Sequence, residues 1–328
     1  MSKMKIVRIF FVTMVVAGLA IPALLAQQPA AALTMKQLKP NVWAGLGGSG
    51  GNSTIIVGQT GVIVVDAKQT EQGAKDLLAE IAKITPKPVK TVVFTHSDGD
   101  HVNGIVAYPA GVTIIAHEND KKELDTALAA GGRGAPPADR LPNRLVTKEK
   151  EATTIDGVKI EFYHFAPAHT SGDLMVFLPD EKIVSTGDIV VTNRADDNPN
   201  IHFEKNGSTD GWLTTVKGLI GLNADTYITG HGDLLTKADL QRKYDATLAR
   251  RNKIAAMVKE GKTLDEIKAA LPDAPAPGAA PRATGAVPAA GAAPRATGAA
   301  GAPPAAPRGG GNAAKTFVET AYTEITKK

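Results

Sequence analysis

Four side chains of metal-binding type lie within six residues, directly after an apolar run. Val92–Phe94 leads into His96, Asp98, Asp100 and His101, in the segment THSDGDH. Imidazole and carboxylate groups bind zinc and harder divalent ions, and a strand end presents such groups from a rigid backbone. Neighbouring residues point to different sides, so four donors in one loop can serve two ions. The segment predicts a metal centre, with a tight turn at its central glycine.

Three further potential ligands are placed in a similar way. His169 lies in APAHTSGD, Asp188 in STGDIV directly after a predicted strand, and His231 in ITGHGD directly after another. The chain has no cysteine, which excludes thiolate metal sites and a cysteine nucleophile. Any metal must therefore be held by His, Asp and Glu. By contrast, His117 and His164 are interpreted as hydrogen-bonded structural residues of strands.

The elements that must position these residues alternate between β-branched runs and helix-like stretches. Strands are predicted at 52–57, 61–65, 91–94, 113–115, 158–165, 174–178, 183–185 and 226–228. Helices are predicted at 70–84, 119–129, 208–222, 236–259 and 264–271, where apolar residues recur every three or four positions. The glycine-rich segment 45–51 lacks a following lysine and is expected to be a hairpin tip. This alternation predicts an α/β fold with sheet packed between helices.

The N-terminal segment 1–26 is typical of a secretory signal peptide. Lys3, Lys5 and Arg8 precede an apolar run that Pro22 interrupts, and small Ala26 follows. We expect a periplasmic or secreted protein with no membrane attachment after cleavage. Removing the three basic residues lowers the net charge from +4 to +1. A near-neutral chain with 5% aromatic residues predicts no nucleic-acid partner and leaves a small-molecule substrate as the expected one.

Composition divides the rest of the chain into three parts. Residues 27–272 have the composition of one globular domain. In 273–312, 32 of 40 residues are Ala, Gly or Pro, so this segment cannot bury enough surface to order and is predicted to be a disordered linker. Residues 313–328 regain apolar residues at helical spacing, which predicts a C-terminal helix that packs back on the domain. The oligomeric state is left open.

The ordered ligand-type residues resemble a known pattern. The run His-x-Asp-x-Asp-His at 96–101, followed by His169, Asp188 and His231, is similar to the signature of the metallo-β-lactamase superfamily, His-x-His-x-Asp-His followed by His, Asp and His. The spacings between the later residues also fit. The resemblance covers about residues 33–271 and implies a four-layer αββα sandwich with a two-metal site at one edge.

The resemblance implies a role for each matched position. His96, Asp98 and His169 would hold the first metal, Asp100, His101 and His231 the second, and Asp188 would bridge them. A hydroxide between two divalent ions, most simply Zn²⁺, would be the nucleophile. Asp100 would orient it and pass a proton to the leaving group.

Two positions depart from the commonest form of the superfamily. Asp98 stands where a second histidine is usual, and its negative charge should make the first site harder, leaving iron or manganese as alternatives to zinc. The flavodiiron oxygen and nitric oxide reductases carry a carboxylate there. Asp188 is the bridging residue found in the superfamily's glyoxalase-like esterases, lactonases and nucleases, whereas zinc β-lactamases usually have Cys or Ser.

The favoured function is therefore an exported, binuclear zinc-dependent hydrolase acting on an ester, thioester, lactone or amide, β-lactams included. Two alternatives stay open: a di-iron redox enzyme of the same fold, and a non-catalytic metal-binding scaffold. His202, in the segment NIHFEKNGS after the Asp188 strand, is a candidate substrate contact, because this fold usually places substrate contacts on that loop.

Overall fold

The computed structural model describes residues 32–132, 135–194, 198–273 and 315–327. By its contacts the chain divides into Met1–Ala30 and Ala31–Lys328, and all described residues belong to the second unit. The predicted signal peptide lies outside the described residues, as does the predicted linker apart from Asp273. Within the described ranges, no helix combines the length and apolar character needed to cross a bilayer.

The first half of the unit forms a seven-stranded sheet with the strand order β1-β2-β3-β4-β5-β6-β7. Strands β1 to β4 are antiparallel neighbours, whereas β4 to β7 run parallel. The strands are β1 Thr34–Lys39, β2 Val42–Leu46, β3 Ser53–Val57, β4 Val62–Val65, β5 Val89–Val93, β6 Thr113–His117 and β7 Arg144–Val146. Segment 45–51 links β2 to β3, as expected of a hairpin tip.

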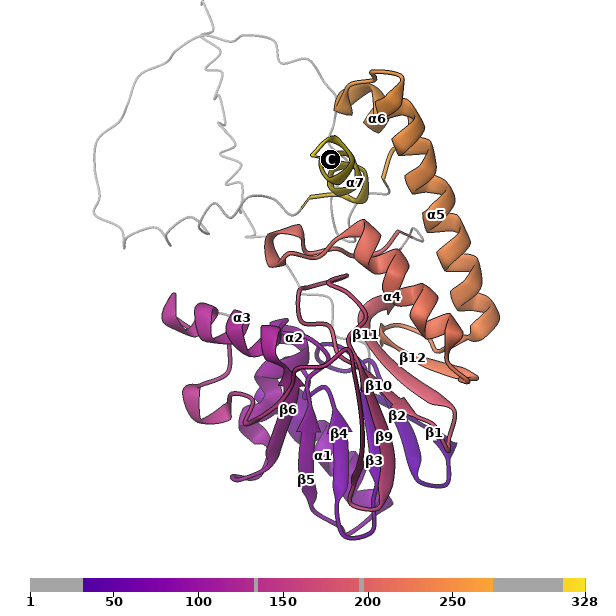
Figure 1. Cartoon of the computed structure of the whole chain (residues 1–328). Helices are drawn as coiled ribbons and strands as arrows, with labels where there is room; N and C mark the ends of the chain where they lie inside the picture. Colours follow the sequence, from indigo (N-terminus) through magenta and orange to yellow (C-terminus); the bar gives the residue numbers. More distant parts are fainter. Residues whose placement is uncertain (1–31, 133–134, 195–197, 274–314, 328) are drawn as a thin grey trace, which may run out of the picture. The chain divides into compact units, whose positions relative to one another are not determined.

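The second half forms a six-stranded sheet with the order β13-β12-β11-β10-β9-β8 (Figure 1). Its strands are β8 Lys150–Ile155, β9 Val158–Tyr163, β10 Met175–Leu178, β11 Ile183–Val191, β12 Thr226–His231 and β13 Leu235–Thr236. Only β11 and β12 pair in parallel. Because they are parallel, Asp188 in the second half of β11 and His231 at the end of β12 lie towards the same edge of the sheet.

The two sheets pack face to face through a shared apolar layer. In that layer Ile56 and Ile63 of the first sheet meet Ile160 and Val176 of the second. The next residue in a strand faces the other way: Ile55, beside Ile56, packs into the cluster under the helices of the first sheet. This alternation with a period of two is the pattern of a strand with two buried faces.

Helices cover both outer faces and complete the four layers. On the first sheet lie α1 Glu71–Ile84 and α3 Glu118–Ala129, and on the second lie α4 Thr209–Gly221, α5 Lys237–Lys259, α6 Leu264–Ala270 and α7 Phe317–Thr326. Short helical turns are α2 Gly99–Val102, η1 Asn103–Ala107, η2 Ala138–Arg140 and η3 Phe203–Lys205. The predicted αββα sandwich is confirmed.

Five strands were not predicted from the sequence: β1, β2, β7, β8 and the two-residue β13. Strands β1 and β8 have every residue exposed or half-buried, and their polar side chains give little apolar signal. Strand β2 contains Ala and Gly, and β7 has three residues. Gly99, predicted to form a tight turn, begins the one-turn helix α2.

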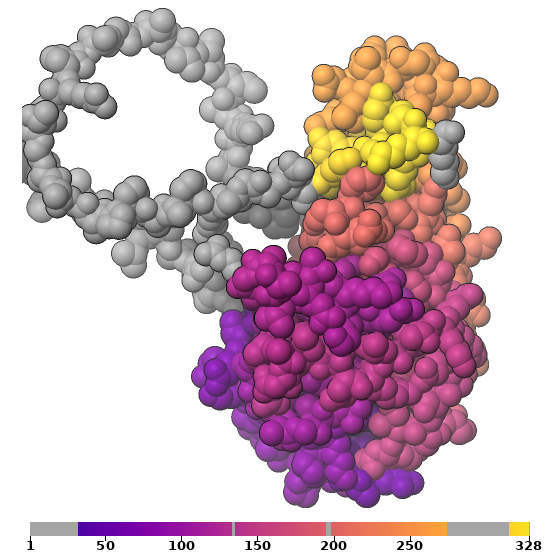
Figure 2. Space-filling view, turned by 60° about the vertical axis from the view of Figure 1, so that its left-hand side comes forward, coloured from indigo at the N-terminus to yellow at the C-terminus, as the bar shows by residue number. Residues whose placement is uncertain are grey.

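The C-terminal helix α7 packs against α4, α5 and α6 (Figure 2, yellow against orange and salmon). Phe317, Val318 and Ala321 are buried in the core of the second sheet's helical face. A capping box of Thr316 and Glu319 begins the helix. The predicted terminal helix is therefore present, and its apolar face completes the core that α4 and α5 leave open.

The buried side chain of His117 should make the stability of the fold depend on pH. It ends β6, accepts a hydrogen bond from Asn119 N at 3.3 Å and stacks on His164 with the ring centroids 3.9 Å apart. Burial and the neighbouring His164 lower the pKa of His117 to about 4. The unfolded chain therefore binds this proton first, and stability is lost as the pH falls from about 6.5 towards 4.

The test compares the wild-type chain with His117→Asn, which keeps a side-chain acceptor at this helix start. Between pH 7 and pH 4 the stability advantage of the wild type should shrink by about 2 kcal/mol, as measured by urea unfolding at each pH. A difference that stays constant across this range would contradict the assigned direction.

Candidate metal centre

The seven predicted ligands converge at one edge of the sandwich, from four parts of the chain. His96, Asp98, Asp100 and His101 follow β5 and enter α2, and the other three come from the second sheet. His169 lies in the loop between β9 and β10, Asp188 in β11 and His231 at the end of β12. Asp188 was predicted to follow a strand directly, but it lies inside β11. That strand continues past Gly187 (φ 52°) with a shift in register.

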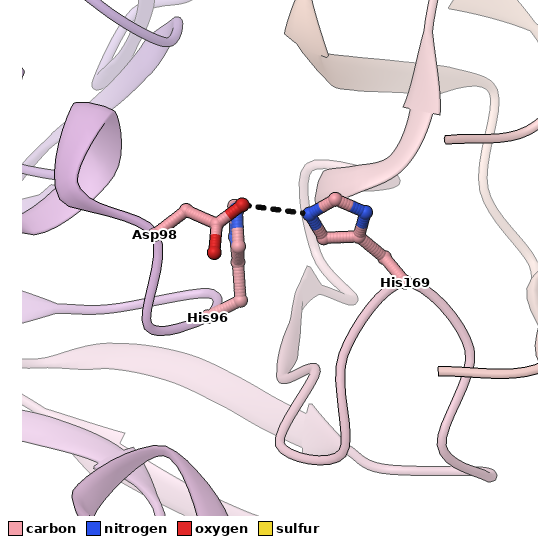
Figure 3. Close-up of side chains that lie close together, drawn as sticks. All are labelled: His96, Asp98 and His169. Atoms are coloured by element: carbon pink, nitrogen blue, oxygen red, sulfur yellow. Dashed lines mark hydrogen bonds and ion pairs between the residues drawn. The ribbon is translucent and has the colours of Figure 1, made fainter. Parts of the chain in front are cut away.

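The first group is His96, Asp98 and His169 (Figure 3). Asp98 Oδ2 lies 3.6 Å from His96 Nε2 and 3.2 Å from His169 Nε2. Two ligands bound at about 2.0–2.1 Å to one tetrahedral zinc are about 3.3 Å apart, so these separations fit a shared ion. His96 Nε2 is buried without a hydrogen-bond partner, which an ion would supply.

The second group is Asp100, His101 and His231. His231 Nε2 lies 3.0 Å from Asp100 Oδ2 and 3.3 Å from His101 Nε2. Asp188 lies between the two groups: its Oδ1 is 3.2 Å from His101 Nε2, and its Oδ2 is 3.9 Å from His169 Nε2. Asp188 Oδ1 is also buried without a hydrogen-bond partner. The donor set therefore fits two divalent cations, with Asp188 able to contact both.

Each of the three buried histidines is oriented through its other ring nitrogen. His101 Nδ1 lies 2.7 Å from Asp66 Oδ2, His96 Nδ1 lies 2.9 Å from Thr95 Oγ1, and His169 Nδ1 lies 2.8 Å from Asn200 O. Such contacts direct Nε2 to the metal and fix the ring. Sequence reasoning missed Asp66, although an acidic residue directly after the apolar run VIVV was an available signal.

The charges of the centre favour anionic carboxylates. Burial alone would raise the pKa of Asp188, but the facing His101 and His231 lower it far below its usual range. Burial acts on Asp98 in the same way, and hydrogen bonds to His169 and His96 lower its pKa more strongly. In turn, Asp66 and Asp188 outweigh burial and raise the pKa of His101. A bound cation would displace the protons on these imidazoles, so metal binding releases protons.

Glycines allow the backbone to approach the ligands closely. A Cβ on Gly51 would lie 2.2 Å from His101 Cε1, and a Cβ on Gly230 would lie 1.9 Å from Asp188 Oδ1. The loop that contains Gly51 is fixed by the buried Lys68, whose Nζ donates to the carbonyls of Gly47 and Gly51 at 2.8 and 2.7 Å. Burial lowers the pKa of Lys68 to about 8.

His202, the predicted substrate contact, lies beside the first group. Its Nε2 is 3.5 Å from Asp98 Oδ2, and its ring is T-shaped to that of His169 with the centroids 4.7 Å apart. Glu204 Oε1 holds its Nδ1 at 2.8 Å. A cavity of about 620 Å³ opens between α3 and residues 204–206, and neither His202 nor a candidate ligand lines it. A second cavity, of about 520 Å³, is lined by the glycine-rich loop and His231.

Comparison with known proteins gives relatives of several activities. The chain is 28% identical over 200 residues to the 2,4-dinitroanisole O-demethylase subunit alpha of Nocardioides sp. (strain JS1661), covering 59% of this chain and 57% of the relative. It is 23% identical to the linear primary-alkylsulfatase of Pseudomonas sp. (strain ATCC 19151), covering 63% and 47%. It is 26% identical to a metallo-beta-lactamase type 2 of Bacillus sp. (strain 170), covering 65% and 81%. The chain thus spans about half the length of the first two relatives.

Solved structures show the same fold. The stereoselective inverting sec-alkylsulfatase Pisa1 from Pseudomonas sp. superposes with a TM-score of 0.61 at 21% identity, covering 74% of this chain and 46% of that one. The DIM-1 metallo-beta-lactamase superposes with a TM-score of 0.56 at 19% identity, covering 67% and 99%. The family model of the metallo-beta-lactamase superfamily matches residues 46–231, more than half of the chain and all seven candidate ligands. The chain therefore belongs to the metallo-β-lactamase superfamily.

Proposed function

We propose that the protein is a binuclear-metal hydrolase that uses water to cleave an ester, thioester, lactone or amide. The observation that carries the proposal is the convergence of four imidazoles, three of them buried, and three carboxylates, with His96 Nε2 and Asp188 Oδ1 buried without hydrogen-bond partners. Superfamily relatives are named for alkyl sulfates, an aryl methyl ether and β-lactams. These substrate classes therefore belong in the test beside carboxylic esters.

Different residues of the chain have different roles in the proposed reaction. His96, Asp98 and His169 would hold one divalent cation, and Asp100, His101 and His231 the other, with zinc as the proposed metal. Two such cations lower the pKa of water towards neutrality and polarise the bond to be cleaved. Asp188, buried between the groups, would contact both cations through its two carboxylate oxygens.

Asp100 is the proposed proton carrier. Its side chain is 31% exposed, against 14% for Asp98 and 7% for Asp188, so Asp100 alone of these three can readily exchange a proton with solvent. It therefore orients the attacking water through its carboxylate and delivers the proton to the leaving group. The cavity that His231 and the glycine-rich loop line is the proposed room for the substrate.

The test is a panel of esters, thioesters, lactones, β-lactams, alkyl sulfates and aryl methyl ethers, assayed with the zinc-loaded protein. We expect hydrolysis of at least one class, loss of turnover with a chelator, and ¹⁸O from labelled water in the acid product of an ester. Asp100→Asn should lower kcat by about 100-fold or more. Asp139→Asn, on the exposed turn η2, is the matched control and should leave kcat unchanged.

Turnover that a chelator leaves intact, or that persists fully in Asp100→Asn, would contradict the proposed mechanism. A protein that holds two zinc ions and hydrolyses no member of the panel would contradict the substrate assignment. Export is also part of the proposal, supported by the N-terminal charged and apolar segment. Cell fractionation tests it, and retention of the full-length chain in the cytoplasm would contradict it.

A further inference from the structure

Lys205 contacts Asp98, the ligand that stands where a second histidine is usual in the superfamily motif. Its Nζ lies 2.5 Å from Asp98 Oδ1 and 3.0 Å from Ser97 Oγ. The other carboxylate oxygen, Asp98 Oδ2, faces His96 and His169. Asp98 therefore presents one oxygen to the first metal group and is held by a lysine through the other.

The loop that carries Lys205 is hydrogen-bonded to the loop that carries His169. His202 N donates to His169 O at 2.8 Å, and Lys205 N donates to His202 O at 2.9 Å. Gly207 lies against His169, since a Cβ there would be 2.3 Å from His169 O. The ammonium group of Lys205 is thus placed by backbone contacts to a proposed ligand, and its side chain is only 29% exposed.

The charges explain why a lysine is needed here. A neutral histidine is usual where Asp98 stands, so Asp98 adds one negative charge to the first group. Lys205 adds one positive charge in direct contact with that carboxylate. The pair therefore has the same net charge as the histidine, and it offers one donor atom, as a histidine would.

We propose that Asp98 and Lys205 act together as an electroneutral replacement for the usual histidine. Lys205 is then a positioning residue: it orients Oδ2 towards the metal and cancels the charge of the carboxylate. This inference rests on the proposed metal centre. It changes the expectation drawn from Asp98 alone, because a neutralised carboxylate keeps the first site suited to zinc instead of shifting it to harder ions.

Binding of a substrate anion is the competing role for Lys205. A chain of hydrogen bonds instead holds the ammonium group of Lys205 beside Asp98. Ser97 Oγ accepts from Lys205 Nζ and donates to Glu123, and Glu123 Oε1 also accepts from Ser171 Oγ at 2.6 Å. Lys122 and Lys205 both line the cavity between α3 and residues 204–206. Lys122 pairs with the exposed Glu118, however, and its own side chain is 66% exposed. Lys122 is therefore the matched control.

The test is a double-variant cycle on zinc affinity, measured by chelator competition in a His231→Ala chain so that the first site is read alone. In Asp98→His the lysine charge is no longer balanced by a carboxylate in contact with it, so adding Lys205→Met should tighten zinc binding by about tenfold or more. With Asp98 present, Lys205→Met should give no such gain in zinc affinity. Loss of the lysine then also removes the group that orients the Asp98 carboxylate, which weakens its binding to the metal. Lys205→Arg should keep the wild-type affinity, and Lys122→Met should change neither background.

Equal effects of Lys205→Met in the two backgrounds would overturn the inference, since Lys205 would then act independently of Asp98. A loss of turnover in Lys205→Met with zinc affinity unchanged in both backgrounds would also overturn it and assign Lys205 to substrate binding. These outcomes differ from failure of the proposed function, in which the wild-type chain itself would not bind zinc.

Discussion

Asp188→Ala should release metal from both groups and reduce kcat/KM at least about a thousandfold. Asp188 faces both sets of ligands, with one oxygen 3.2 Å from His101 Nε2 and the other 3.9 Å from His169 Nε2. Its removal leaves the buried imidazoles of the two groups without the carboxylate between them. Zinc per chain, measured by elemental analysis after gel filtration, should fall from two to less than one.

The control for this change is Asp180→Ala, whose side chain is 61% exposed and pairs with Lys159 on the surface. It should keep two zinc ions and full turnover, because exposed ion pairs contribute little. A folded Asp188→Ala chain that retains two zinc ions would show that Asp188 is not a ligand. Circular dichroism of both variants establishes that the fold is kept.

Gly51→Ala should have the second largest effect, although it changes no ligand. The new Cβ would lie 2.2 Å from His101 Cε1 and 2.5 Å from His101 Nε2, distances that real side chains do not tolerate. His101 cannot move freely, because Asp66 holds its Nδ1 and the side chain is fully buried. The second group should therefore open, with loss of one zinc ion and a decrease in kcat of about 100-fold or more.

Gly221→Ala is the matched control, since a Cβ at that helix terminus meets no atom within 4 Å. It should keep two zinc ions and wild-type kcat. Zinc stoichiometry and kcat of the two glycine variants are measured side by side. Wild-type values in Gly51→Ala would mean that the loop moves away from His101 at no cost, and that the glycine is not required for the centre.

The sequence was most informative where local chemistry and local structure coincide. His96, Asp98, Asp100 and His101 follow one buried strand, so a single segment revealed four of the seven candidate ligands. The major helices were also predicted, because apolar spacing and capping residues such as Thr236 act within a few residues. His117 and His164 were interpreted as structural, and the structure shows them stacked on each other, each with a backbone partner.

What the sequence did not reveal depends on contacts between distant residues. Asp66 and His101 are 35 residues apart, and Lys205 and Asp98 are 107 apart, so no local pattern joins them. Strands β1 and β8 are exposed or half-buried throughout, and the tertiary pairing with β2 and β9 determines their structure. Neither the clash at Gly51 nor the charge balance at Asp98 can be seen before the chain is folded.

The central claim is that two cations lie between the seven ligands, and anomalous diffraction at the zinc edge tests it most directly. Crystals of the zinc-loaded chain should give two peaks per chain. We expect one peak among His96, Asp98 and His169 and the other among Asp100, His101 and His231, with Asp188 in contact with both. A single peak, or none at these residues, would contradict the binuclear centre and the hydrolytic mechanism built on it.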